Sequence, residues 1–291
     1  MSKLRAKQPD EVKPSKIKMM IFGPSGVGKT WLSLAFPKPY YIAPENGADR
    51  QQYRARLKEV GGVYMGPEEG ATNFPSVLDE IKTLATERHE YKTLIIDSIT
   101  KLYQVCIADE AEKLGSKDAF GASKKPAIAN MRRLVNWVQK LDMNVLFVAH
   151  EITEWGNDEK GNRTEIGKIP DVWEKLIYEL DLTIHAKKFG PNRSGIVTKS
   201  RLEGFADGSS FPLTYEEFGK RYDKAIIESA SVPVELATPA QVARIRELLA
   251  VLKIDEKEIE TWNSKAGADS FEEYSSEHIA KTITYLEKKT K

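Results

Sequence analysis

Eight consecutive residues near the start of the chain limit what it can fold into. They follow the apolar run at residues 17–22, precede a helix-forming run at residues 30–35, and match G-x-x-x-x-G-K-T: Gly23, Pro24, Ser25, Gly26, Val27, Gly28, Lys29 and Thr30. In this pattern the glycines let backbone N–H groups point at phosphate oxygens, the lysine reaches the β- and γ-phosphates, and the threonine hydroxyl ligates Mg²⁺. The pattern predicts a strand, a phosphate-binding loop and a helix in sequence, with a nucleoside triphosphate and Mg²⁺ as ligands.

Composition excludes several classes of protein. With 291 residues, 41% of them hydrophobic, the chain suits one larger domain with an appendage. It has no apolar run of about 18 residues and no apolar signal segment at the N-terminus, so we expect a cytoplasmic protein. Because the net charge is only +1, any basic surface that binds nucleic acid must be confined to part of the protein. The single cysteine, Cys106, excludes an intramolecular disulfide and is expected to be a buried apolar residue.

Strand-like and helix-like segments alternate after the N-terminus. The expected strands lie at residues 17–22, 40–43, 93–96 and 145–149, and the expected helices at residues 49–59, 76–87, 101–113 and 128–141. Strands that are apolar along their whole length are typical of a parallel sheet covered by helices on both faces. Residues 181–188 and 195–201 predict an antiparallel hairpin at one edge. The fold class is therefore α/β.

The predicted domain organisation has four parts. Residues 1–16 form a flexible basic leader, residues 17–228 the core, residues 229–237 a linker, and residues 238–291 a small helical domain. The last domain begins with a helix-start pattern, in which Thr238 is the N-cap, Pro239 the first helical residue and Gln241 the partner in a capping box.

Three polar residues follow expected strands on the edge where a parallel sheet binds its ligand. Asp97 ends the run at residues 94–96 and is the expected partner of Thr30 in holding Mg²⁺; the alternative is an acidic helix cap. Glu45 follows the strand after the phosphate-loop helix and is the candidate base that activates water; otherwise it is an exposed turn carboxylate. His150 ends the strand at residues 145–149 and is either a sensor of the γ-phosphate or an ordinary strand-end histidine.

A pair of cations lies on the second strand of the expected hairpin. Lys199 and Arg201 are two residues apart, so they project from the same side of a strand. They are either part of a solvated sheet face or cations that reach the phosphates bound by a neighbouring subunit.

These segments occur in the order seen in the RecA-like recombinase and hexameric-helicase ATPases. Residues 17–225 resemble most closely the bacteriophage Sak-type single-strand annealing ATPases, which are similar to the core of RecA and Rad proteins. The resemblance implies a RecA-like core that binds ATP, with Glu45 activating water, His150 sensing the γ-phosphate, and Lys199 and Arg201 acting between protomers of a ring or filament. It also implies the cytoplasm of a bacterial host if a phage encodes the chain.

The resemblance places two DNA-binding loops at residues 115–125 and 153–168. The first offers cations and an aromatic ring, and the second, with a net charge of −1, offers one tryptophan; the expected contacts are Lys117, Phe120, Lys124, Lys125 and Trp155. Plain surface loops are the alternative in both places. The C-terminal domain is expected to bind DNA or a single-strand-binding or other recombination protein, or else to act as a stabilising cap.

Taken together, the sequence predicts an oligomeric DNA recombination or annealing ATPase that binds single-stranded DNA and hydrolyses ATP at subunit interfaces. A helicase or helicase loader shares every motif named above. A DNA-binding scaffold clamped by ATP, with little hydrolysis, is the other alternative. A small-molecule kinase is disfavoured because we find no arginine-rich lid segment in the sequence.

Overall fold

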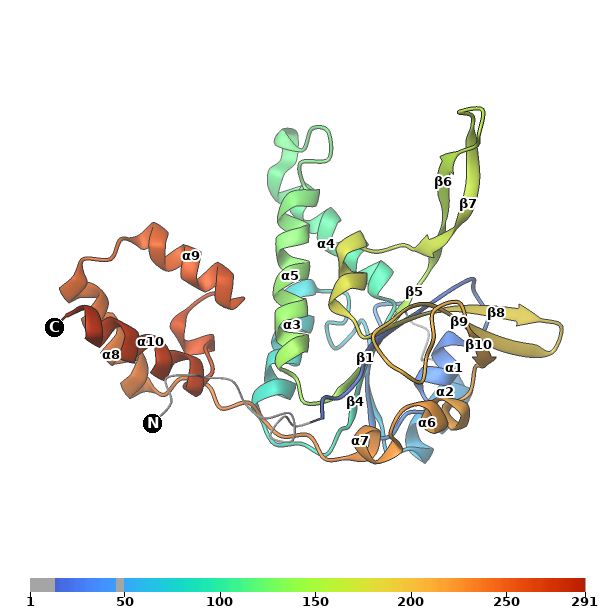
Figure 1. Ribbon diagram of the computed structural model, residues 1–291, viewed down its shortest axis with the longest axis horizontal. Helices are drawn as coiled ribbons and strands as arrows, with labels where there is room; N and C mark the ends of the chain where they lie inside the picture. Colours follow the sequence, from blue (N-terminus) through green and yellow to red (C-terminus); the bar gives the residue numbers. More distant parts are fainter. Residues whose placement is uncertain (1–13, 46–49, 291) are drawn as a thin grey trace. The chain divides into compact units, whose positions relative to one another are not determined.

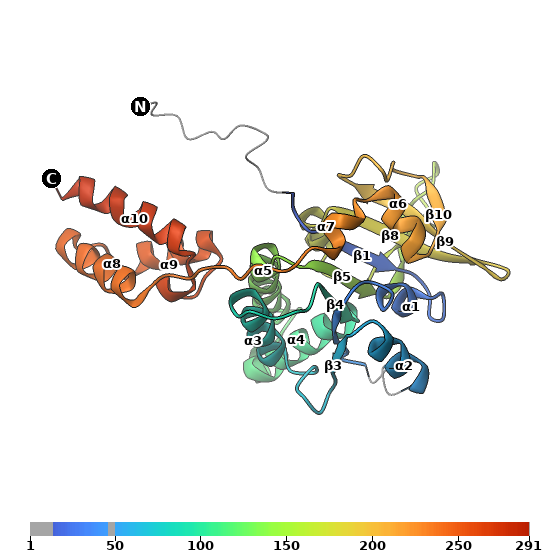
Figure 2. The same ribbon diagram turned by 90° about the horizontal axis from the view of Figure 1, so that it is seen from below.

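The structure is a computed structural model that describes residues 14–45 and 50–290. Most of the predicted basic leader therefore lies outside the described residues. Eight strands form one sheet in the order β10, β9, β8, β1, β5, β4, β2, β3 (Figures 1 and 2). Their bounds are β1 Lys18–Phe22, β2 Pro39–Ile42, β3 Val63–Met65, β4 Thr93–Asp97, β5 Asn144–Ala149, β8 Leu182–Phe189, β9 Asn192–Ser200 and β10 Ser210–Pro212.

The sheet is mostly parallel. Strands β3, β2, β4, β5, β1 and β8 run in parallel, whereas β9 pairs antiparallel with β8, and β10 with β9. All of β1 and β5 and nearly all of β4 are buried, as expected for strands covered on both faces. The predicted α/β class and the antiparallel edge are confirmed.

Four helices pack on one face of this sheet through a shared apolar core. They are α1 (Lys29–Ser33), α2 (Gln51–Glu59), α6 (Tyr215–Arg221) and α7 (Lys224–Glu228). Their buried side chains Leu32, Leu57, Phe218 and Ile227 join residues of the strands in one cluster. This packing fixes α1, and with it the end of the phosphate loop, against the sheet.

Strands β6 (Glu151–Asn157) and β7 (Arg163–Pro170) form a two-stranded antiparallel ribbon outside the main sheet (Figure 1). The prediction of a loop at residues 153–168 is therefore wrong, because most of these residues belong to the two strands. Asp158 makes the turn: its Oδ1 accepts hydrogen bonds from the backbone N–H groups of Lys160 and Asn162 at 2.9 and 2.8 Å. An Asp turn between two short extended segments is a hairpin signal that the prediction overlooked.

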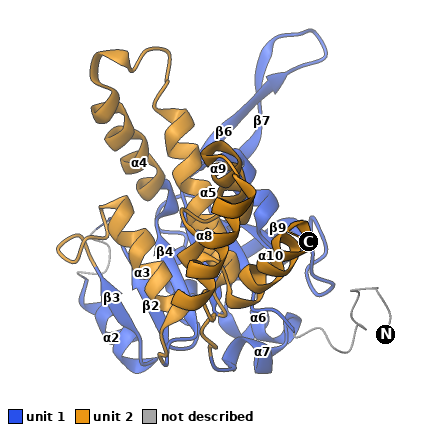
Figure 3. Ribbon diagram, turned by 90° about the vertical axis from the view of Figure 1, so that its left-hand side faces the viewer, with its two compact units in different colours: residues 1–65, 90–100, 143–230 blue, residues 66–89, 101–142, 231–291 orange. Residues whose placement is uncertain are grey.

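The chain divides into two compact units (Figure 3). The first comprises residues 1–65, 90–100 and 143–230, with the sheet and the ribbon; the second comprises residues 66–89, 101–142 and 231–291. The helices of the second unit are α3 Phe74–Thr86, α4 Ile99–Leu114, α5 Lys124–Lys140, α8 Pro239–Leu252, α9 Glu256–Ala266 and α10 Ser276–Lys289, with Ile99 and Thr100 of α4 in the first unit. The domain boundaries proposed from the sequence stay a prediction.

The C-terminal helices have their own apolar core, in which Val242, Ile245 and Leu249 of α8 pack with Ile279 and Leu286 of α10. The predicted capping box at the start of α8 is present: Gln241 N–H donates to Thr238 Oγ1, and Thr238 N–H donates to Gln241 Oε1. Cys106 is buried, as expected.

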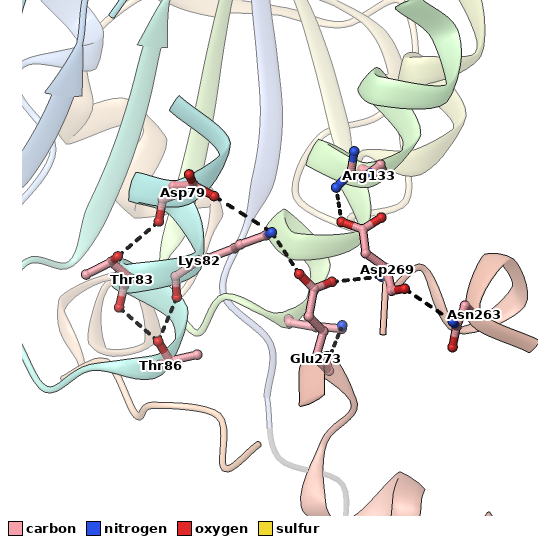
Figure 4. A network of polar contacts seen from close by, with 9 residues as sticks. Asp79, Lys82, Thr83, Thr86, Arg133, Asn263, Asp269 and Glu273 are labelled. Carbon is pink, nitrogen blue, oxygen red and sulfur yellow. Dashed lines mark hydrogen bonds and ion pairs between the residues drawn. The ribbon is translucent and has the colours of Figure 1, made fainter. Parts of the chain in front are cut away.

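Polar contacts join this helical segment to α3 and α5 within the second unit (Figure 4). Lys82 of α3 contacts Glu273 at 2.7 Å, and Arg133 of α5 contacts Asp269. The backbone N–H of Asp269 donates to Glu273 Oε2 at 3.0 Å, so the two ion pairs form one network.

Candidate nucleotide-binding site

The predicted phosphate loop connects β1 with α1. Gly23 leaves the strand with φ +148°, and a Cβ atom there would lie 2.5 Å from the carbonyl oxygen of Ala186 on β8. Gly28 has φ +98° immediately before the helix. A side chain is excluded at the first position by contact and strained at the second by conformation, so both positions require glycine.

Lys29 is held over the loop. Its side chain is largely buried, and its Nζ donates to the carbonyl oxygens of Gly23 and Pro24 at 2.6 and 2.8 Å. Burial lowers the pKa of this ammonium group, while Asp97, Glu151 and Glu45 raise it. A buried ammonium held by carbonyls on its own loop is suited to an anionic ligand.

Thr30 and Asp97, the two residues predicted to hold Mg²⁺, are in contact. The Thr30 hydroxyl donates to Asp97 Oδ2 at 2.5 Å, and the Tyr41 hydroxyl donates to the same oxygen at 3.1 Å. Burial raises the pKa of Asp97, and these two hydrogen bonds oppose that shift. A hydroxyl beside a carboxylate is an oxygen donor set that suits Mg²⁺, which keeps most of its other ligands as water or phosphate.

Among the described residues, no group of three or more His, Cys, Asp or Glu side chains is arranged to hold a metal ion by itself.

Glu45 and His150, predicted separately from two strand ends, lie together. His150 Nε2 is 3.2 Å from Glu45 Oε1, and the Ser98 hydroxyl donates to the same carboxylate oxygen. The backbone N–H of His150 donates to Thr100 Oγ1 at 3.0 Å, which fixes the strand end. Glu45 is about one-third exposed, so water can reach it.

One cavity of about 640 Å³, a size typical of small-molecule sites, is lined by Lys29, Thr30, Glu45, Asp97 and His150. Trp31 and Tyr53 are on its wall, with ring centroids 6.3 Å apart. The cavity also contains residues that the sequence analysis missed: Tyr41, Arg50, Gln52, Tyr53 and Arg193. Tyr41 lies on β2, the strand that leads to Glu45, so its place in the sequence could have indicated a site residue. Arg193, in contrast, is brought to the cavity by the pairing of β8 with β9.

Lys199 and Arg201 do not line this cavity. Lys199 Nζ donates to the carbonyl oxygen of Leu180, and Arg201 Nη2 donates to that of Tyr178. Both cations are therefore held by the segment that precedes β8 in the same subunit, and their role between protomers stays a prediction.

The expected DNA contacts fall in two places, one in each compact unit. Trp155 lies on the β6–β7 ribbon, is 53% exposed, and carries the guanidinium of Arg163 at 4.9 Å from its ring centroid. In the second unit Lys117 ends a 3-10 segment, Gly115–Lys117, Phe120 is fully exposed, and Lys124 and Lys125 begin α5.

The fold and the site together define a P-loop ATPase. Residues 15–206 match a family described as an AAA domain, and the chain belongs to this family. A solved structure described as a prototypical ATPase from the type III secretion system of pathogenic bacteria is similar at 13% identity. That similarity covers 94% of this chain and 81% of that one, with a TM-score of 0.41. No curated protein matches the chain. Within the described residues, no helix is both long and apolar enough to cross a membrane.

Proposed function

We propose that the protein is an ATP-dependent DNA recombination or annealing ATPase that binds single-stranded DNA and hydrolyses ATP where subunits meet. The observation that carries the ATPase part is the convergence of two side-chain pairs, Thr30 with Asp97 and Glu45 with His150, on the cavity of the phosphate loop. One pair suits a metal-bound triphosphate, and the other suits the activation and sensing of water beside it.

Each residue has a distinct role in this proposal. The loop N–H groups and Lys29 bind the phosphates, while Thr30 and Asp97 hold Mg²⁺, whose chemistry is to neutralise charge on the β- and γ-phosphates. Glu45 orients a water molecule and accepts its proton. His150, in contact with Glu45, responds to loss of the γ-phosphate and begins the turn into the β6–β7 ribbon.

Lys199 and Arg201 supply cations to a neighbouring subunit in this proposal. Their exclusion from the cavity of their own subunit supports action in trans, because they reach no phosphate bound there. Release from the carbonyl groups of Leu180 and Tyr178 frees both donors for a neighbour's phosphates. The protein is then a homo-oligomer, ring or filament, that hydrolyses ATP slowly as a monomer.

Single-stranded DNA is the proposed partner because exposed aromatic side chains lie beside cations. On the ribbon, the guanidinium of Arg163 lies over Trp155, which combines a stacking surface with phosphate-binding charge. In the second unit, the exposed Phe120 belongs to the same chain segment as Lys117, Lys124 and Lys125. The C-terminal helices are proposed to bind DNA or another recombination protein.

The test measures ATPase rate against single-stranded DNA concentration at several salt concentrations, with particle size followed in parallel. The ATPase rate and the particle size should rise together as DNA is added. The DNA concentration that gives half of the maximal rate should increase with salt concentration, because salt weakens binding to phosphates. Processive strand separation would favour a helicase instead. An ATPase rate that does not change with DNA concentration, together with an unchanged rate in Glu45→Gln, would favour a DNA-binding scaffold clamped by ATP.

A matched pair of variants tests the ribbon. Stacking of a base on an aromatic ring contributes about 1–3 kcal/mol, so Trp155→Ala should bind single-stranded DNA about fivefold more weakly or worse. Trp155→Phe keeps a ring and should retain most of the affinity. Equal affinities for both variants and the wild type would remove Trp155 from the proposed DNA surface.

A further inference from the structure

The β8–β9 hairpin continues past the end of the phosphate-loop strand. β1 ends at Phe22, which pairs with His185, whereas β8 runs on to Phe189 before the chain turns into β9 (Figure 1). Gly23, the first residue of the phosphate loop, packs against Ala186 in this continuation. The outer half of the hairpin therefore lies beside the phosphate loop of the same subunit.

Strand register decides which hairpin side chain reaches the loop. Arg193 of β9 lies opposite Lys188, and Gly195 lies opposite Ala186. Side chains alternate along a strand, so Arg193 shares a face with Ala186 and Val197. Those two residues belong to the apolar core that contains Val27 of the loop and Leu32 of α1.

Arg193 extends along this face onto Gly28. A Cβ atom on Gly28 would lie 2.8 Å from Cδ and 3.0 Å from Nε of Arg193. The stem of the arginine is therefore in close contact with the last glycine of the loop, where a larger residue would displace it. Arg193 also lines the cavity together with Lys29 and Thr30.

The guanidinium group is available to a ligand. Arg193 is exposed, and within residues 14–45 and 50–290 its side chain makes no hydrogen bond or ion pair. An arginine presents five donors in a fixed fork that matches the oxygens of phosphate groups. The backbone N–H groups beside it belong to the part of the loop that cradles the α- and β-phosphates.

A β-bulge separates Arg193 from Lys199, the other cation of β9. The register shifts between Thr183 and Ile184, so that Ile184 lies opposite Val197 and Thr183 lies opposite Lys199. Since Thr183 and Ile184 face opposite sides of the sheet, Lys199 projects from the face opposite to that of Arg193. β9 thus carries Arg193 on the face that lines the cavity of its own subunit, and Lys199 on the opposite face.

We propose that Arg193 binds the α- and β-phosphates of the nucleotide held by the phosphate loop of its own subunit. The β8–β9 hairpin is then a clamp in cis, distinct from the trans role of Lys199 and Arg201. This inference rests on the proposed function, because it requires that the loop binds a nucleoside triphosphate.

The test compares Arg193→Ala with Lys188→Ala, which removes the cation directly opposite and does not touch the cavity. Affinity is measured by titration with a fluorescent ADP, and by its displacement with inorganic pyrophosphate, in the presence of Mg²⁺. Loss of a charge-assisted pair should weaken both ligands about tenfold or more in Arg193→Ala, and less in Arg193→Lys. Lys188→Ala should remain within about twofold of the wild type.

The outcomes separate this inference from the proposed function. If the wild type binds ADP and hydrolyses ATP while Arg193→Ala binds both ligands as tightly, the clamp is wrong and the ATPase stands. If Arg193→Ala weakens ADP but leaves pyrophosphate unchanged, the arginine contacts the base, which also overturns the inference. If Lys29→Ala and the wild type bind ADP equally, the proposed function itself fails. Thermal unfolding of each variant confirms that all four proteins are folded.

Discussion

The hydroxyl of Thr30 donates a 2.5 Å hydrogen bond to Oδ2 of Asp97, although the two residues are 67 positions apart. Thr30 follows β1, and Asp97 ends β4, with β5 between these strands in the sheet. The contact forms because all three strands are parallel and end at the same edge. It brings both proposed Mg²⁺ ligands to one point of the cavity.

The first prediction concerns the stability of Asp97→Asn. Burial raises the pKa of the Asp97 carboxyl group above its unfolded value, so the folded protein binds a proton there more readily than the unfolded chain. Its contribution to stability is therefore present below the unfolded pKa of about 3.9 and is lost as pH rises through the folded pKa. At pH 7, Asp97→Asn should therefore raise the free energy of unfolding of the nucleotide-free protein.

Urea unfolding at pH 7 and at about pH 4 measures this difference, which should shrink at the lower pH. The same variant should lose Mg²⁺-dependent ATP hydrolysis, since the amide is a poorer ligand. A variant that is less stable than the wild type at both pH values, and still active, would contradict the assignment of Asp97.

Lys29→Ala should abolish nucleotide binding. The alanine removes the cation that contacts the loop carbonyls of Gly23 and Pro24, and charge-assisted bonds to phosphate cannot form. Calorimetric titration with ATP should show an affinity at least tenfold below that of the wild type. Lys38→Ala, which breaks only the exposed pair with Glu90, is the control and should bind normally.

Mixing two inactive variants tests the role of Arg201 between subunits. Lys29→Ala lacks a working phosphate loop, and Arg201→Ala lacks the proposed trans cation. Hybrid interfaces in the mixture pair an intact loop with an intact arginine, so part of the ATPase rate should return. If no mixing ratio restores activity, Arg201 acts in cis or has no catalytic role.

The ion pairs of Figure 4 should differ in strength. Lys82 and Glu273 are mostly buried, at 23% and 17% exposed, whereas Arg133 and Asp269 are 39% and 45% exposed. Exposed pairs contribute about 0.2–1 kcal/mol, so double-mutant cycles in urea should give a larger coupling energy for Lys82 with Glu273. A larger coupling for the exposed pair would show that burial does not control this contact.

The loop and the parallel sheet could be predicted because their signals are local. Glycine spacing around Lys29 and uninterrupted apolar runs such as residues 93–96 mark the elements directly. Parallel strands then place Glu45 and His150 at one edge, and their 3.2 Å contact follows from that topology.

The position of Arg193 and the face of Lys199 depend on the register between β8 and β9 and on one bulge, which no short pattern reveals. The contact of Arg193 with Gly28 joins residues that are far apart in the chain. Contacts of this kind are set by strand pairing, so they appear only once the strands are placed in space.

Glu45→Gln tests the central claim most directly. The substitution keeps the size of the side chain and a hydrogen-bond acceptor for Ser98, but removes the base. Single-turnover hydrolysis of ATP with Mg²⁺ and single-stranded DNA should slow by about a hundredfold or more, with ATP affinity close to that of the wild type. Hydrolysis at the wild-type rate in Glu45→Gln would contradict the account of this site.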